Sequence, residues 1–294
     1  MIWSGVGLVV AGVALNPSAF TGGGAVGAVG GVLLAALGLL LSVVGLVLSG
    51  VRAVIVRGGL PETRYRGPSV AVLFVLGLIA GVVLTLALGP EGIDALLGGS
   101  APPGVTLLAL TSFQVGLLAV IGIFVIGPRA LAGTHLVPNG GWGRGVLLGL
   151  GLGVPAWLVT TLLLVVVAAV LELAGLPAEP GLAEEVAASL DPTVVVLAFV
   201  VIAPVAEELF FRGVVLTAWE REYGPRVALI GSAALFAVAH ISVLQAIPIF
   251  VLGLMLGVVY RRTRSLPASI ALHAAFNAIS VGITFLVRLG IVTV

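Results

Sequence analysis

Nine apolar stretches separated by short polar connections dominate the pattern of this chain. A bilayer core about 30 Å thick needs about 20 apolar residues per helix, and most of the stretches reach that length. They lie near residues 2–20, 24–50, 68–89, 104–127, 145–171, 193–217, 226–243, 245–260 and 267–290. The first is interrupted by Asn16-Pro17 and the eighth is short. The pattern therefore predicts an all-α polytopic membrane protein with about eight or nine transmembrane helices.

Composition supports this fold class and excludes several functions. Hydrophobic residues make up 60% of the chain and charged residues only 9%, whereas soluble domains carry about 25% charged residues. The net charge is +1, so nothing indicates nucleic-acid binding. Because cysteine is absent, a thiol nucleophile, a disulfide framework and a thiolate metal site are all excluded.

Charge in the connections alternates along the chain and predicts an orientation. The basic connections are 51–67, 128–144 and 261–266, the acidic ones are 90–103 and 172–192, and 218–226 carries two Arg against two Glu. Basic loops stay in the cytoplasm by the positive-inside rule. If every segment spans, the N-terminus is cytoplasmic and the C-terminus is external.

Three charges lie inside the apolar segment 193–217. Glu207, Glu208 and Arg212 are preceded and followed by apolar residues, and a charge in hydrocarbon costs from about 3 to above 10 kcal/mol. Arg212 alone could extend to the headgroups, but the two carboxylates are too deep for that explanation. Glu208 and Arg212 are four residues apart and are predicted to pair on one helix face. Glu207 lies about 100° around the helix and is the better candidate for a general base.

Two histidines and an asparagine lie in later apolar segments. Glu207 is 16 residues before Tyr223 and His240 is 15 after Pro225, so in a helical hairpin both lie about 23 Å from the turn. His273 and Asn277 are four residues apart on one helix face. We therefore expect these polar groups to meet at a site within the membrane that opens to the cytoplasm.

Such a set of residues is suited to hydrolysis. A glutamate beside a histidine can activate water, and a second histidine with an asparagine can stabilise an oxyanion. Glu207, His240 and His273 could instead hold zinc as two histidines and one carboxylate. No His-Glu-x-x-His motif supports the zinc alternative.

Three motifs in order carry a family resemblance: Glu-Glu-x-x-x-Arg at Glu207 to Arg212, Phe-x-x-x-His at Phe236 to His240, and His-x-x-x-Asn at His273 to Asn277. With these motifs the chain resembles the CPBP (Abi) family of intramembrane proteases, which includes the CAAX prenyl endopeptidases. The resemblance covers about residues 193–280. It implies an eight-helix type of fold with a conical intramembrane cavity that opens to the cytoplasm and to lipid.

The resemblance also implies an activity and residue roles. The expected reaction is hydrolysis of a peptide bond near the C-terminus of a lipidated (CAAX-like) or membrane-embedded substrate. Glu207 would activate water with help from His240, and His273 and Asn277 would form the oxyanion site. The residues implied to support this geometry are Glu208, Arg212 and Phe236. No cofactor is expected, with zinc as the alternative.

The organisation that follows is a multi-pass protein of the cell membrane in two parts. Residues 1–190 are expected to form N-terminal helices and an external polar loop, and residues 191–294 the catalytic core. The expected partners are membrane lipids and the peptide substrate. A non-catalytic scaffold or immunity protein and a proton-coupled transporter remain open as alternatives, because intramembrane Glu and His also occur there.

Overall fold

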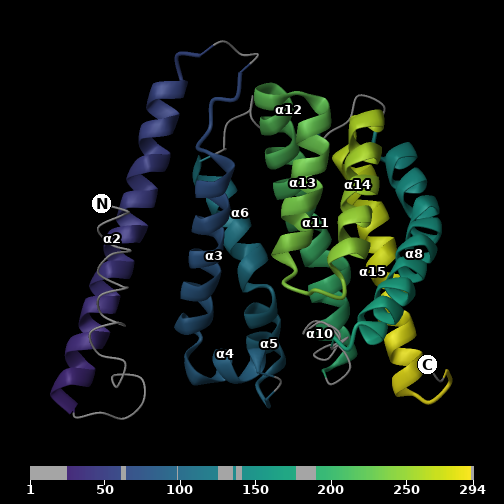
Figure 1. The fold of residues 1–294 in the computed structure, drawn as a ribbon, viewed down its shortest axis with the longest axis horizontal. Coiled ribbons are helices and arrows are strands. Elements are labelled where there is room, and N and C mark those ends of the chain that lie inside the picture. The colour runs from purple at the N-terminus through teal and green to yellow at the C-terminus, as the bar shows by residue number, and fades with distance from the viewer. Residues whose placement is uncertain are drawn as a thin grey trace.

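The computed structural model describes residues 25–60, 64–97, 99–124, 135–136, 141–176 and 190–292. Within these ranges every regular element is a helix and there is no strand, which confirms the all-α prediction. The long helices stand side by side, with α2 at one end of the row and α8 and α15 at the other (Figure 1). The first predicted segment, residues 2–20, lies outside the described residues.

The helices have the following bounds: α2 Ala25–Arg57, α3 Val70–Ala87, α4 Gly89–Leu96, α5 Pro103–Leu110, α6 Ser112–Phe124, α8 Trp142–Leu173, α10 Pro192–Val195, η2 Val196–Ile202, α11 Ala203–Glu208, η3 Leu209–Leu216, α12 Thr217–Tyr223, α13 Pro225–Ala239, α14 Ala246–Thr263 and α15 Leu266–Arg288. Among the described residues, six helices are long and apolar enough to cross a membrane. The predicted span 104–127 is bent by 59° between α5 and α6 and would be a seventh. The structure thus supports a multi-pass membrane protein, while the count of eight or nine stays a prediction.

The helix that carries the two carboxylates is continuous from Pro192 to Tyr223. Asp191 caps its start, because the side chain accepts hydrogen bonds from the backbone N–H groups of Thr193 at 2.8 Å and Val194 at 3.3 Å. These bonds stabilise the ionised carboxylate and lower the pKa of Asp191 below its ordinary value.

Two stretches of this helix, η2 and η3, are wider π-helical turns, and they flank the short α-helical segment α11. In η2 the N–H of Ala203 bonds to the carbonyl of Ala198, five residues earlier. The next residue is Pro204, which has no N–H to donate. The carbonyl of Phe199 therefore loses both of its usual backbone partners at this point.

Close packing at glycines joins two pairs of helices, α8 with α15 and α3 with α6. Gly145, Gly149 and Gly153 recur every fourth residue on α8 and face α15, where a side chain at Gly149 would collide with the Ala268 carbonyl. On α3, Gly77 and Gly81 face α6 in the same way. Small residues at membrane helix interfaces let the backbones approach closely, so both helix pairs are held at short range.

Ion pairs join the helix ends at the basic side of the protein. Arg57 pairs with Glu222 at 2.8 Å, and Glu220 pairs with Arg261 at 3.2 Å and with Arg264 at 3.8 Å. These helix ends lie together at the upper edge of the row, with α12 among them (Figure 1). The pairs are partly exposed, so each contributes at most about 1 kcal/mol. The cytoplasmic location of this side stays a prediction.

Candidate active site

Glu208 is the centre of a buried polar network. Arg212 donates to it at 2.8 Å, and neither side chain is exposed, which confirms the predicted pair. Arg212 also donates to the carbonyl of Gly253 at 2.9 Å. On α15 the hydroxyl of Ser269 donates to the other oxygen of Glu208, and Nδ1 of His273 lies 3.2 Å from Glu208 Oε1. The Glu208 carboxylate thereby connects α11 to α15, and its partner Arg212 makes the connection to α14.

An aromatic stack covers this network. The guanidinium of Arg212 lies 4.6 Å from the ring centre of Phe236, which is fully buried. The rings of His240 and His273 contact the same phenyl ring edge-on, at centroid distances of 4.7 and 5.6 Å. A cation over an aromatic face in a desolvated setting gains about 2 kcal/mol. Phe236 is therefore the contact that joins α13 to the Glu208 network.

Glu207 points to a different helix from Glu208. It is 7% exposed, and Oε1 accepts a hydrogen bond from the side-chain amide of Gln114 on α6 at 2.9 Å. No arginine pairs with Glu207 in the described part of the chain, so its charge is not neutralised by direct contact. Sequence reasoning did not select Gln114, although a polar amide within the apolar stretch 104–127 was an available signal.

His240 ends α13 and is exposed. Nδ1 lies 2.7 Å from the carbonyl of Phe236, which can only accept, so Nδ1 carries the proton and Nε2 faces away from this contact. The next residue, Ile241, has a left-handed φ of 49° and is 92% exposed. That conformation is unusual for a β-branched residue and marks a strained turn directly after the histidine.

Asn277 binds the widened turn before the carboxylates. Its amide nitrogen donates to the carbonyl of Phe199 at 2.7 Å. That carbonyl is the one left without a backbone donor by Pro204, so Asn277 supplies the missing hydrogen bond. His273, one turn earlier on α15, faces Glu208 instead.

The structure thus connects some of the predicted site residues and separates others. His273 contacts Glu208 directly and His240 joins the network through Phe236, whereas Glu207 and Asn277 contact Gln114 and Phe199. Among the described residues, no hydrogen bond or ion pair links His240 to Glu207. The joint roles expected for these residues in catalysis stay predictions.

A zinc set of Glu207, His240 and His273 does not fit this arrangement. In the ranges that the structure describes, no three His, Cys, Asp or Glu side chains come close enough to share a metal ion. His273 uses Nδ1 on Glu208, which already binds Arg212 and Ser269. Glu207, His240 and His273 therefore do not form a shared ligand set in the described structure.

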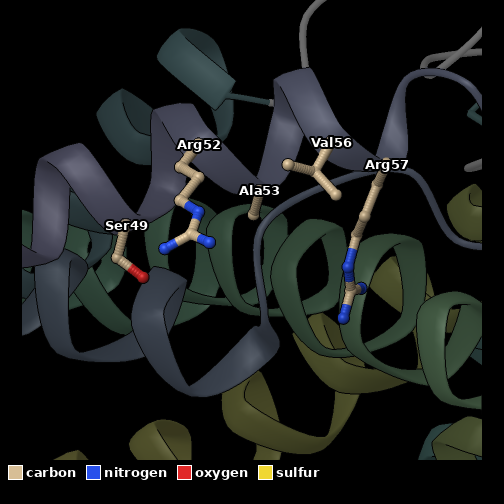
Figure 2. Close-up of a pocket in the computed structure, with 5 residues that line it drawn as sticks. All are labelled: Ser49, Arg52, Ala53, Val56 and Arg57. Atoms are coloured by element: carbon tan, nitrogen blue, oxygen red, sulfur yellow. The ribbon is translucent and has the colours of Figure 1, made fainter.

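A separate hollow of about 290 Å³ lies on α2 and is lined by Ser49, Arg52, Ala53, Val56 and Arg57 (Figure 2). All five lining residues come from one helix, and none belongs to the networks of Glu207 or Glu208. This hollow is therefore distinct from the candidate site, and the conical cavity stays a prediction.

Comparison with known proteins bears on the C-terminal part of the chain. No significant match was found among curated proteins or among solved structures. Residues 189–279 match the model of the family described as type II CAAX prenyl endopeptidase Rce1-like, and this match confirms the resemblance carried by the three motifs.

Proposed function

We propose that the protein is an intramembrane endopeptidase that hydrolyses a peptide bond near the C-terminus of a lipidated, CAAX-like or membrane-embedded substrate. The observation that carries this proposal is that two adjacent carboxylates have different partners. Glu208 is neutralised by Arg212, whereas Glu207 is buried without a cation partner among the described residues. A carboxylate held in this state is suited to accept a proton. The family match supports peptidase chemistry.

In the proposed reaction Glu207 removes one proton from a water molecule. The water oxygen adds to the carbonyl carbon of the scissile bond and forms a tetrahedral intermediate with an oxyanion. The intermediate then collapses, the carbon–nitrogen bond breaks, and the proton on Glu207 passes to the amine that leaves. The second hydrogen of the water stays on the new carboxylic acid and then passes to the amine, so the products are one carboxylate and one ammonium group. A general base of this kind contributes about 10²–10⁴-fold to the rate.

His240 assists this proton transfer in our proposal. Because its Nδ1 proton is held by the Phe236 carbonyl, the lone pair on Nε2 is the free acceptor of the ring. The ring also packs against Phe236, which limits its rotation. His240 can therefore present Nε2 in a constant direction to the water or to the leaving amine.

The oxyanion would be stabilised by His273 and Asn277. His273 donates Nδ1–H to Glu208, so its Nε2 can donate to an oxyanion only when the ring is protonated. The amide of Asn277 has two N–H groups and spends one on Phe199, which leaves the second for the oxyanion.

A cleavage assay with purified protein in detergent tests this proposal. The probe is a quenched, farnesylated CAAX peptide, cleaved by wild type, Glu207→Gln and His240→Ala, each with and without a strong chelator. We expect Glu207→Gln to lose at least about 100-fold in kcat and the chelator to have no effect. Glu220→Gln is the matched control, because this carboxylate lies on the same continuous helix but pairs with arginines at its end.

Two results would contradict the proposal. Full activity in Glu207→Gln would remove Glu207 from the chemistry. Loss of activity on chelation, with recovery on added zinc, would replace the water-activating glutamate by a metal centre. If wild type cleaves neither this peptide nor a membrane-embedded peptide, a non-catalytic scaffold becomes the better explanation.

A further inference from the structure

Gln114 lies at the depth of Glu207 but on a helix outside the family match. It belongs to the first turn of α6, directly after the 59° bend that separates α5 from α6. The span 103–124 places Gln114 near its middle, as the span 192–223 does for Glu207. The matched residues 189–279 do not include α6, so the family motifs give no role to Gln114.

The position of Gln114 is fixed by close packing of α6 on α3. A side chain at Gly81 would collide with the backbone of Phe113, the residue before Gln114, and one at Gly116 would collide with the carbonyl of Gly77. Contacts this close leave α6 little freedom to slide or rotate. The amide of Gln114 is therefore presented to Glu207 by a rigid support.

The two polar atoms of the Gln114 amide, Nε2 and Oε1, differ in their hydrogen bonding. Nε2 donates to Glu207 Oε1 at 2.9 Å, and this assignment is set by chemistry because an ionised carboxylate only accepts. Oε1 of Gln114 is buried and has no hydrogen-bond partner among the described residues. A buried acceptor without a donor is rare in proteins, so this oxygen keeps an unused capacity to accept a hydrogen bond.

We propose that Gln114 completes the catalytic site from the N-terminal half of the chain. Its Nε2 holds the Glu207 carboxylate in place, and its Oε1 accepts a hydrogen bond from the water that Glu207 activates. That water donates one hydrogen to Gln114 and gives the other to Glu207, so its oxygen lone pair is directed at the scissile carbonyl. This inference rests on the proposed function, because it assigns Gln114 to the same water.

The test compares Gln114→Met and Gln114→Asn with wild type and with Thr111→Val. Methionine keeps the length of the side chain and removes both polar atoms, while asparagine keeps the amide but is one methylene too short to reach. Thr111 is the matched control, because it is buried at the same bend and its hydroxyl bonds only within its own segment, to the Leu107 carbonyl. The titratable and charged groups of the site (Glu208, Arg212, His240 and His273) are unchanged in all variants.

Cleavage of the farnesylated CAAX peptide gives the first readout. We expect kcat to fall about 10- to 100-fold in both Gln114 variants with KM unchanged, since misplacing a catalytic group by about 1 Å costs up to about 10²-fold. Thr111→Val should keep the wild-type kcat. A variant that merely loosened the fold would lower the amount of active enzyme and the thermal stability, so both are measured alongside.

Labelling of Glu207 by a hydrophobic carbodiimide, followed by mass spectrometry, gives a readout that needs no catalysis. This reagent needs a free carboxyl oxygen, and in wild type Nε2 of Gln114 is bonded to Oε1 of Glu207 at 2.9 Å. We expect several-fold more labelling at fixed pH in Gln114→Met and no change in Thr111→Val. Wild-type kcat and labelling in Gln114→Met would overturn the role of Gln114 while leaving the proposed function intact. Increased labelling with no cleavage by wild type would overturn the proposed function and support the contact.

Discussion

The hydrogen bond from Asn277 to Phe199 leads to a prediction that does not depend on catalysis. Asn277→Leu keeps the size of the side chain but leaves the Phe199 carbonyl without a donor, because Pro204 cannot supply one. The same substitution in a Pro204→Ala background should cost less. Alanine restores a backbone N–H within reach of this turn, so the carbonyl then has a second donor.

The expected magnitude follows from the state of the carbonyl. Leaving a buried acceptor unpaired costs about 1–3 kcal/mol, while hydrogen bonds between membrane helices contribute about 0.6 kcal/mol on average and about 1.7 at most. The Phe199 carbonyl has no backbone alternative, so we expect Asn277→Leu to cost about 1.5 kcal/mol, in the upper part of the membrane range. In the Pro204→Ala background we expect less than half of this cost, which gives a coupling energy of about 1 kcal/mol.

The assay is reversible unfolding in mixed detergent micelles, followed by circular dichroism for wild type, the two single variants and the double variant. Ser280→Ala is the matched control, because this hydroxyl lies on the same helix and bonds within it to the Phe276 carbonyl. It should show no coupling to Pro204→Ala. Equal costs of Asn277→Leu in both backgrounds would refute the reasoning, since the carbonyl would then not depend on the missing N–H.

Two further predictions concern carboxylates on the same continuous helix. Glu208→Gln leaves the buried Arg212 without its ion pair and should cost about 3–5 kcal/mol of stability, measured by the same unfolding assay, with Glu220→Gln near wild type; a stable but inactive Glu208→Gln would favour a direct catalytic role. Asp191→Ala should lower the thermal stability at neutral pH by loss of the helix cap. Because folding lowers the pKa of Asp191, this stabilisation is complete above the unfolded pKa of about 3.9 and is lost as pH falls through the folded value. The difference between wild type and Asp191→Ala should therefore shrink in acid, while Asp191→Asn, which keeps an acceptor that does not titrate, should show little of this pH dependence; a constant difference across the acid range would count against the cap.

Contacts within one helix could be predicted from the sequence. Glu208 and Arg212 are four residues apart, and helical geometry alone puts them on one face. The pair is found as predicted. The same geometry puts His273 and Asn277 on one face, yet each binds a different helix segment, because their partners are set by how α15 packs against α11 and η2.

Contacts between helices that are far apart in the chain could not be predicted from the sequence. Gln114 and Glu207 are 93 residues apart, and no periodicity relates them. Ser269 and the Gly253 carbonyl join the Glu208 network for the same reason, since only tertiary packing brings α14 and α15 to this point. The π-helical turns could not be predicted either, because widening a turn changes the backbone hydrogen bonds without changing the apolar pattern of the sequence. Pro204 was the only local sign of the first one.

Two adjacent carboxylates have different environments because they lie about 100° apart on the short segment α11, between the two widened turns. The turn before them leaves a carbonyl that Asn277 captures, and in the turn after them the hydroxyl of Thr217 donates to the Arg212 carbonyl, five residues earlier. Side chains thus compensate the irregular backbone on both sides of α11, as membrane helices require. Between these turns, Glu208 faces α15 and meets a cation, whereas Glu207 faces α6 and accepts a hydrogen bond from a neutral amide. A neutral donor positions a carboxylate without forming an ion pair with it, so Glu207 is held in place with no cation in direct contact among the described residues.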